Sequence, residues 1–290
     1  YTLGAVRVDV YPNSQLYKDR EEIEALQLGA VQMLAPSLSK FGTMGVRDFE
    51  VFDLPYMFPN KATLYRVMDG EIGKRLFDKL EPRGIKGLAY WDNGFKQMSG
   101  NRPLKTLADF RGLKMRIQSS RVLDAQMRAL GANPVVMPFS DAHAALQQGV
   151  VDGTENPLSN FHTHRMQEVQ KHLTLSDHGY LGYALIANKA FWDGLKPEIR
   201  SALERAVRET TAYERQIAQR ENDDALAALK AAGVTEIFVL SNAARREWQQ
   251  ALLPVHEQFA DVVGQDTIQS IYRMAAKVDK DQSPRNHPGR

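Results

Sequence analysis

The sequence contains no cysteine among its 290 residues. This excludes disulfide bonds, thiolate metal sites and a thiol nucleophile, but it says little about the compartment, because oxidising environments also hold cysteine-free proteins. Long apolar runs are missing as well, and none approaches the ~20 residues that a membrane-spanning helix needs. The composition therefore predicts an ordinary globular chain with no membrane span.

An excess of charge of one sign is also missing. Lys and Arg number 37 against 35 Asp and Glu, which gives a net charge of +2. Such a balance is unlike the concentrated basic field of a nucleic-acid-binding protein, so we expect no nucleic-acid partner. Any affinity for an anion must come from a local site.

Motifs of common catalytic and cofactor sites are absent. The sequence holds no G-x-S-x-G, G-x-x-x-x-G-K-[ST], G-x-G-x-x-G or H-E-x-x-H pattern. His162 and His164 are two residues apart and would point to different sides of a helix, which favours surface or capping roles over a metal site. We expect no metal and no cofactor.

The amino end is unusual. It opens with YTLGAVRVDV, without the basic start and apolar run of a signal peptide, which predicts a cytoplasmic or already processed protein. Ala5 to Val10 alternate apolar and polar residues and predict a strand. YTL precedes it without the crossover of about a dozen residues that parallel neighbours need. Either YTL belongs to the same strand, or a segment is missing between Leu3 and Gly4.

Strand and helix patterns alternate along the rest of the chain, which favours an α/β architecture with a substantially parallel sheet. FEVFDLPYMF is apolar enough to be buried, although Pro55 and Pro59 argue against a regular central strand. No glycine or further proline occurs between Pro197 and Gly233. We expect one helix there, roughly 50 Å long, which is enough to span two lobes.

The stretch GLKMRIQSSRVLDAQMRALG places Arg116 in a predicted strand that runs into a helix, with Ser119 and Ser120 as candidate N-caps. A solvated edge face is the simple interpretation, since charged residues are mostly exposed. The alternative is a ligand site, because open α/β sheets bind ligands at the carboxyl ends of their strands. A planar guanidinium there would suit a carboxylate.

Three other residues lie at predicted strand ends. Lys96 follows an apolar strand through a glycine turn, Asn156 precedes Pro157 in TENPLSN, and Phe139 follows a proline. Taken singly, they indicate a solvated lysine, a turn and a core aromatic residue. Together with Arg116, they suggest that several strand ends converge on one anion.

At these residues the sequence meets a known family. GLKMRIQSS, LGANPVVMPFSDAHAALQQGVVDGTENPLSN and VQKHLTLSDHGYLGYALIANKAFWDGL closely resemble the substrate-binding proteins of tripartite ATP-independent periplasmic (TRAP) transporters, of the DctP type. YPNSQLYKDREEIEALQLGAVQM resembles the same family nearer the amino end. The resemblance implies a type II-like periplasmic binding protein fold, in which two α/β lobes are joined by crossing strands and a very long helix.

The resemblance also implies how the chain divides. Residues 1–93 would form the first part of lobe I, and residues 94–181 the first part of lobe II. Residues 182–221 would return to lobe I and begin the long helix, and residues 222–290 would end it and add C-terminal helices that pack mainly on lobe II. Relatives carry a strand, a loop and a helix between segments like YTL and GAV, so we expect a segment to be left out here.

A ligand site follows from the same resemblance. Arg116 would hold a ligand carboxylate bidentately, and Asn156 of the Glu-Asn-Pro motif would contact the ligand. Phe139 would pack beside it, and Ser119 faces the ligand in some relatives. Lys96 would supply a second cation, which we expect to receive the distal carboxylate of a four-carbon diacid because a one-headed acid would leave it unpaired.

The implied function is that of a periplasmic receptor in its mature form. It would bind a C4-dicarboxylate such as malate, succinate or fumarate and deliver it to the membrane permease subunits of a TRAP transporter, without bond chemistry and as a monomer. One alternative keeps this role for an aromatic, keto or sugar acid. Another is an enzyme on a two-lobed α/β scaffold, because a fold does not fix a function.

Overall fold

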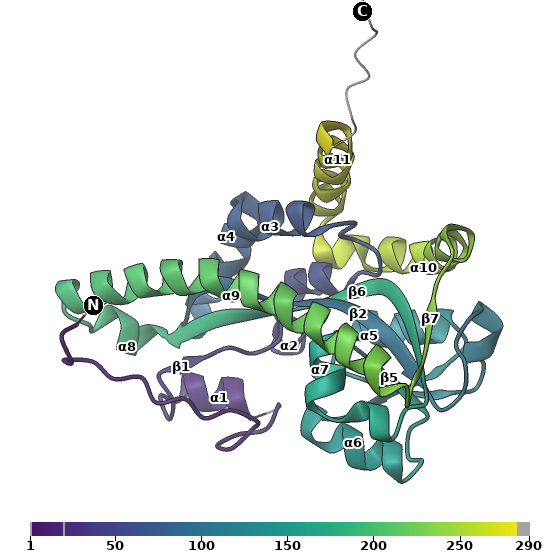
Figure 1. Cartoon of the computed structure of the whole chain (residues 1–290). Coiled ribbons are helices and arrows are strands. Elements are labelled where there is room, and N and C mark those ends of the chain that lie inside the picture. Colours follow the sequence, from purple (N-terminus) through teal and green to yellow (C-terminus); the bar gives the residue numbers. More distant parts are fainter. Residues whose placement is uncertain (1, 20, 283–290) are drawn as a thin grey trace, which may run out of the picture.

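A computed structural model describes residues 2–19 and 21–282, and seven strands within these ranges form one sheet (Figure 1). Their order is β1-β6-β2-β5-β3-β4, and β7 pairs with β6 outside this path. The strands are β1 (Met33–Leu34), β2 (Ile85–Gly100), β3 (Lys114–Ile117), β4 (Asn133–Val136), β5 (Gly153–Asn156), β6 (His172–Asn188) and β7 (Glu236–Val239).

The long strands β2 and β6 connect the two lobes. They pair antiparallel from Ile85 opposite Asn188 to Gly100 opposite His172. β1 joins β6 near the Asn188 end, whereas β5 joins β2 near the Gly100 end. The two ends of this ribbon therefore carry separate groups of strands, and the ribbon itself forms the crossing connection between the lobes.

The prediction of a substantially parallel sheet is wrong. Strands β3 and β4, β3 and β5, and β6 and β7 are parallel, but the long β2–β6 pair is antiparallel, as are β1–β6 and β2–β5. The reason is the crossing ribbon, in which one strand enters the second lobe and the other returns. Alternating strand and helix patterns do not reveal that return.

Helices flank the sheet in both lobes (Figure 1). The α-helices are α1 (Glu22–Gln27), α2 (Lys40–Thr43), α3 (Lys61–Asp69), α4 (Glu71–Asp78), α5 (Arg121–Ala129), α6 (Phe139–Gln147), α7 (Leu158–Thr163), α8 (Lys189–Asp193), α9 (Pro197–Ala232), α10 (Asn242–Val263) and α11 (Gln265–Gln282). Short 3-10 turns are η1 (Arg47–Asp53), η2 (Glu81–Arg83), η3 (Leu107–Phe110) and η4 (Met166–Glu168).

Helix α9 confirms the long helix expected from the sequence. It begins with Pro197, whose missing N–H costs nothing in the first turn, and it ends at Gly233, which adopts φ 63° and donates its N–H to the Leu229 carbonyl. Figure 1 shows α9 running across both lobes, and it packs on β2 and α7. Neither α9 nor any other helix in the described part of the chain combines the length and apolar character needed to cross a membrane.

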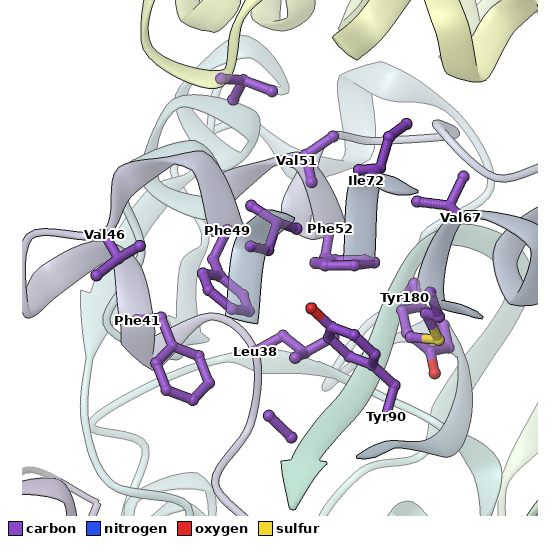
Figure 2. Packing of buried hydrophobic residues seen from close by; sticks show 14 of the residues in the cluster. Leu38, Phe41, Val46, Phe49, Val51, Phe52, Val67, Ile72, Tyr90 and Tyr180 are labelled. Carbon is purple, nitrogen blue, oxygen red and sulfur yellow. The ribbon is translucent and has the colours of Figure 1, made fainter. Parts of the chain in front are cut away.

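The core of the first lobe is aromatic. The FEVFDLPYMF stretch is buried, as predicted, and forms η1 in place of a strand. Figure 2 shows Phe41, Phe49, Phe52 and Tyr90 gathered in this core, with ring centroids 4.5 Å apart for Phe41 and Phe49 and 5.8 Å apart for Phe52 and Tyr90. Such aromatic contacts stabilise the packing of the first lobe.

Two further clusters fill the second lobe. Met115 of β3, Met127 of α5 and Trp248 of α10 belong to one, and helices α6, α7 and the end of α9 form the other. Helix α10 also buries Phe259 in the first lobe's core, and α11 packs on α3 and α10. The last helix therefore lies on residues that the sequence assigns to lobe I, while the lobe boundaries themselves stay a prediction.

The strand predicted for Ala5 to Val10 is wrong. These residues have no regular structure, and Val8 and Val10 are largely exposed. Alternation favours a strand only where one face can pack and the backbone finds a neighbour, and this segment has neither. Thr2 and Leu3 are not part of such a strand, since Leu3 and Gly4 form a turn. The segment expected to be missing at this point stays a prediction.

Candidate functional site

Arg116 lies inside the second lobe and not on an edge. Strand β3 lies between β4 and β5, and the Arg116 residue is 2% exposed, so the interpretation as a solvated edge face is wrong. The strand and the helix after it occur where the sequence predicted them. Ser120 is the N-cap of α5, and its hydroxyl accepts the Leu123 N–H.

The Arg116 guanidinium has a neutral partner. Its Nε and Nη2 donate to the carbonyl of Met137 at 3.1 and 2.8 Å, and its Cζ lies 5.4 Å from the Phe139 ring centroid. Within the described residues, no carboxylate lies within ion-pair distance of it. Burial lowers the pKa of Arg116 to about 10, although Asp19 and Glu155 oppose this. At neutral pH it remains a buried cation without a contacting anion.

A cavity of about 480 Å³ lies between the two lobes. Arg116 is not among its lining residues, but Met137, the hydrogen-bond partner of Arg116, is. One wall comes from the start of the chain, α1 and α2, and the other from the segments that follow β3 and β4. Ser119, whose contact with a ligand stays a prediction, lines the cavity. The residues that line it are Asp19, Ile23, Glu24, Gln27, Lys40, Thr43, Met44, Gln118, Ser119, Val136, Met137 and Pro138.

A larger groove, of about 570 Å³, lies elsewhere, between α5 and α10. Three arginines, Arg47, Arg121 and Arg128, line it, but none of the site residues predicted from the sequence does. Arg128 is already paired with Asp124. We therefore place the candidate site at the smaller cavity, next to the buried guanidinium.

Phe139 contacts Arg116, and Asn156 lies on β5, the strand next to that of Arg116. Phe139 is the first residue of α6, and its ring contacts His164 at 4.2 Å as well as Arg116. Asn156 ends β5 and is 5% exposed, with its side-chain amide donating to the Thr154 hydroxyl. The interpretation of Asn156 as a turn residue is wrong, because it pairs within the sheet.

Lys96 has a partner inside the protein. Its ammonium lies 2.7 Å from Glu155 Oε1, and the two side chains are 1% and 2% exposed. Glu155 Oε2 also accepts from Gln126 and contacts His178 Nε2. Burial alone would raise the pKa of Glu155, but Lys96 and His178 hold it well below its usual value. The premise that Lys96 would be unpaired without a ligand is therefore wrong.

The sequence did not indicate three charged residues at or near the cavity, namely Asp19, Lys40 and Asp53. Lys40 lies 2.9 Å from Asp19 Oδ1 and also contacts Glu22. Asp53, from η1, accepts from the hydroxyls of Ser39 and Ser120 at 2.6 and 2.7 Å, so it joins the first lobe to the N-cap of α5.

The sequence matches the family described as bacterial extracellular solute-binding protein, family 7 (DctP), over residues 1–261. The C4-dicarboxylate-binding periplasmic protein DctP of Rhodobacter capsulatus is 60% identical over 277 residues, which cover 96% of this chain and 83% of the relative.

Two crystal structures share the fold. A TRAP periplasmic solute-binding protein from Sulfurospirillum deleyianum with bound succinate has a TM-score of 0.91 and 46% identity, and the match covers 94% of this chain and 89% of that one. The sugar acid binding protein DctPAm from Advenella mimigardefordensis, in complex with galactonate, has a TM-score of 0.88 and 33% identity, covering 91% and 85%. The family resemblance and the two-lobed fold expected from the sequence are thus confirmed, and the chain belongs to the DctP family of bacterial extracellular solute-binding proteins, which are transport receptors and not enzymes.

Proposed function

We propose that this chain is an extracytoplasmic, periplasmic receptor that binds a C4-dicarboxylate such as succinate, malate or fumarate. It passes the ligand to the membrane permease subunits of a TRAP transporter and acts as a monomer. Family membership supports the receptor role, and the name of the Rhodobacter capsulatus relative and the succinate in the Sulfurospirillum deleyianum structure support the ligand class.

The observation that carries this proposal is the state of Arg116. Its guanidinium is buried and charged, and among the described residues its hydrogen bonds go to the backbone carbonyl of Met137, which lines the cavity between the lobes. A ligand carboxylate offers two parallel acceptors in place of one carbonyl, and such charge-assisted pairs are about twice as strong as neutral ones. This site therefore favours binding of a carboxylic acid.

The other predicted residues would surround the same ligand. Phe139 covers the guanidinium face, and Ser119 lines the cavity at the N-terminal side of α5. Asn156 lies on β5, the strand next to Arg116. Lys96 is the exception, because its charge is neutralised by Glu155 and it would not contact the ligand.

Binding would draw the lobes together around the β2–β6 ribbon. The cavity has walls from both lobes, so a bound acid contacts each of them. Hinge closure of this type uses a few connecting residues while the lobes move as units. The closed form would then be the one that the permease recognises.

One alternative ligand has support of its own. The galactonate-binding relative has 33% identity and the same fold, so a sugar acid in place of a C4-dicarboxylate is the second candidate. It would use the same arginine for its carboxylate. Its hydroxyl groups would need polar partners that a C4 diacid does not.

Mass spectrometry of small molecules released by denaturing the purified protein separates these candidates, followed by calorimetric titration with the acid found. We expect succinate, malate or fumarate, recovered unchanged and rebinding at one site per chain. Release and rebinding of a sugar acid would favour the alternative. Failure to bind any carboxylate after removal of the released ligand would contradict the receptor function proposed here.

A further inference from the structure

Asp19 places a carboxylate of the protein itself at the candidate site. Its Oδ2 accepts the N–H of Phe139, the first residue of α6, at 3.0 Å. Its Oδ1 lies 2.9 Å from the ammonium of Lys40. A helix-start N–H and an ammonium are groups that bind the carboxylate of a ligand. Asp19 therefore occupies a site with the chemistry of a carboxylate subsite.

Arg116 adds to this environment without touching Asp19. Burial would raise the pKa of Asp19, but Lys40, the Phe139 N–H and the charge of Arg116 together lower it below its ordinary value. Asp19 is thus ionised at neutral pH. Its side chain is 25% exposed and borders the cavity, so a solute in the cavity can reach the same partners.

We propose that Lys40 and the Phe139 N–H form the second carboxylate subsite of this receptor, and that Asp19 occupies the subsite until a dicarboxylate displaces it. The inference rests on the function proposed above and names the residues that read the second carboxylate. It assigns to Lys40 the role that the sequence suggested for Lys96.

The contrast between the two lysines supports this assignment. Lys40 lines the cavity and its side chain is 13% exposed, whereas Lys96 is 1% exposed and is not among the lining residues. Moving Lys96 to a ligand would strand the buried carboxylate of Glu155, which is strongly unfavourable. Moving Lys40 would release Asp19 toward solvent, where a charged carboxylate is well hydrated.

The charges around Lys40 favour replacement of Asp19 by a ligand carboxylate over binding of a ligand carboxylate beside Asp19. Lys40 already contacts two carboxylates, those of Asp19 and Glu22. Burial raises the pKa of Glu22, and the charge of Asp19 raises it further, although Lys40 opposes both effects. A third carboxylate at one ammonium would increase this repulsion. A ligand carboxylate that replaces Asp19 leaves the number unchanged.

Exchange would also produce selectivity. An acid with one carboxylate binds at Arg116 and leaves Asp19 in place, so it gains nothing from Lys40. A four-carbon diacid gains Lys40 and the Phe139 N–H but must displace Asp19. Removing the charge of Asp19 should therefore strengthen binding of the diacid specifically, and removing Lys40 should weaken it specifically.

The test is calorimetric titration of wild type, Asp19→Asn and Lys40→Met with succinate and with butyrate, its monocarboxylate analogue. For Asp19→Asn, we expect succinate to bind about tenfold more tightly, equivalent to about 1.4 kcal/mol. Butyrate affinity should change about twofold at most. For Lys40→Met, succinate affinity should fall at least about 30-fold, the lower end for truncating a partner in a charged contact, while butyrate changes little.

Lys79→Met is the matched control, since Lys79 pairs with Asp48 on the surface of the first lobe, outside the cavity lining. It should leave both affinities unchanged. Circular dichroism checks folding, and Asp19→Ala repeats the test if the asparagine variant does not fold. Weaker or unchanged succinate binding in the Asp19 variants, or an unchanged succinate-to-butyrate ratio in Lys40→Met, overturns the inference alone. Wild type that binds no C4-dicarboxylate overturns the proposed function itself.

Discussion

Arg116 and Lys96 are two buried cations on either side of the same strand. Arg116 is on β3 and Lys96 on β2, and β5 lies between these strands. Both residues are almost completely shielded from water, at 2% and 1% exposure. Their partners differ, because Arg116 donates to a backbone carbonyl, whereas Lys96 pairs with the Glu155 carboxylate.

Under the function proposed above, this difference separates a ligand-binding cation from a structural one. A guanidinium on a neutral carbonyl improves its interactions when an anion arrives, since an ionic acceptor is stronger. An ammonium that leaves a buried carboxylate creates an unpaired charge, which costs several kcal/mol. Burial and position alone do not distinguish the two cations. The partner of each cation indicates whether it is available to a ligand.

The largest expected effect comes from breaking the structural pair. Glu155→Gln leaves the Lys96 ammonium buried without a counter-charge, and breaking such a pair costs about 3 to 5 kcal/mol of unfolding free energy. Urea denaturation of wild type and variant measures it. Glu236→Gln, which removes the exposed partner of Lys105, is the control and should have a far smaller effect. A change below about 1 kcal/mol for Glu155→Gln would erase the distinction between the two cations.

Arg116→Ala should strongly weaken ligand binding, which is the second largest effect that we expect. Loss of one partner of a buried charged contact costs about 2 to 5 kcal/mol, which is about a 30-fold to several-thousand-fold rise in Kd. Arg116→Lys should also bind poorly, since an ammonium cannot offer two parallel donors. Calorimetric titration with succinate measures both variants.

Arg128→Ala serves as the control for Arg116, because Arg128 is exposed on α5 and pairs with Asp124. It should retain the affinity of wild type. Near-native succinate affinity in Arg116→Ala would remove this arginine from the site, and loss of affinity in both variants would indicate a general effect of positive charge on α5 and β3.

Local signals in the sequence predicted helix α5, which follows Arg116, and the long helix α9. The N-cap at Ser120 and the long run from Pro197 to Gly233 are properties of neighbouring residues, and both appear in the structure. The direction of β6 is not local, since it depends on which lobe the chain returns to. The predicted strand at Ala5 to Val10 failed for a similar reason, because its pattern does not show whether a neighbouring strand exists.

The sequence could not predict which residues contact the charged side chains of the candidate site. Asp19 and Phe139 are 120 positions apart, and Lys96 and Glu155 are 59 apart. The first contact joins the two lobes, and the second forms only when β2 and β5 pair in the sheet. Lys40 carried no motif at all and became visible through the cavity that it lines.

Glu214 shows the opposite balance to Glu155. It lies on α9, where its Oε2 accepts the backbone N–H of Asp92 on β2 at 2.9 Å. Burial is the largest influence on Glu214 and the charge of Asp92 adds to it, so its pKa rises to about 7, although that N–H and the charge of Arg215 oppose the shift. Both glutamates lie beside the crossing strand β2, where Glu155 is buried and Glu214 is half-buried, and of the two only Glu155 contacts a lysine and a histidine.

The smallest expected effect follows from this contrast and depends on pH. The ordinary pKa of 4.5 for Glu214 rises to about 7 on folding, so the folded chain binds more protons between these values and loses stability as pH rises through them. Because Glu214 is partly exposed, we expect a loss of only about 1 kcal/mol.

Glu214→Gln keeps the acceptor for Asp92 and should remove this loss, so that urea denaturation finds the variant more stable than wild type at pH 8 and equal to it near pH 4. Glu221→Gln, exposed on the same helix, should show no such change between the two pH values. A Glu214→Gln difference that stays constant across this range would mean that Glu214 titrates like an exposed carboxyl, and that burial at the ribbon leaves unpaired carboxyls ionised.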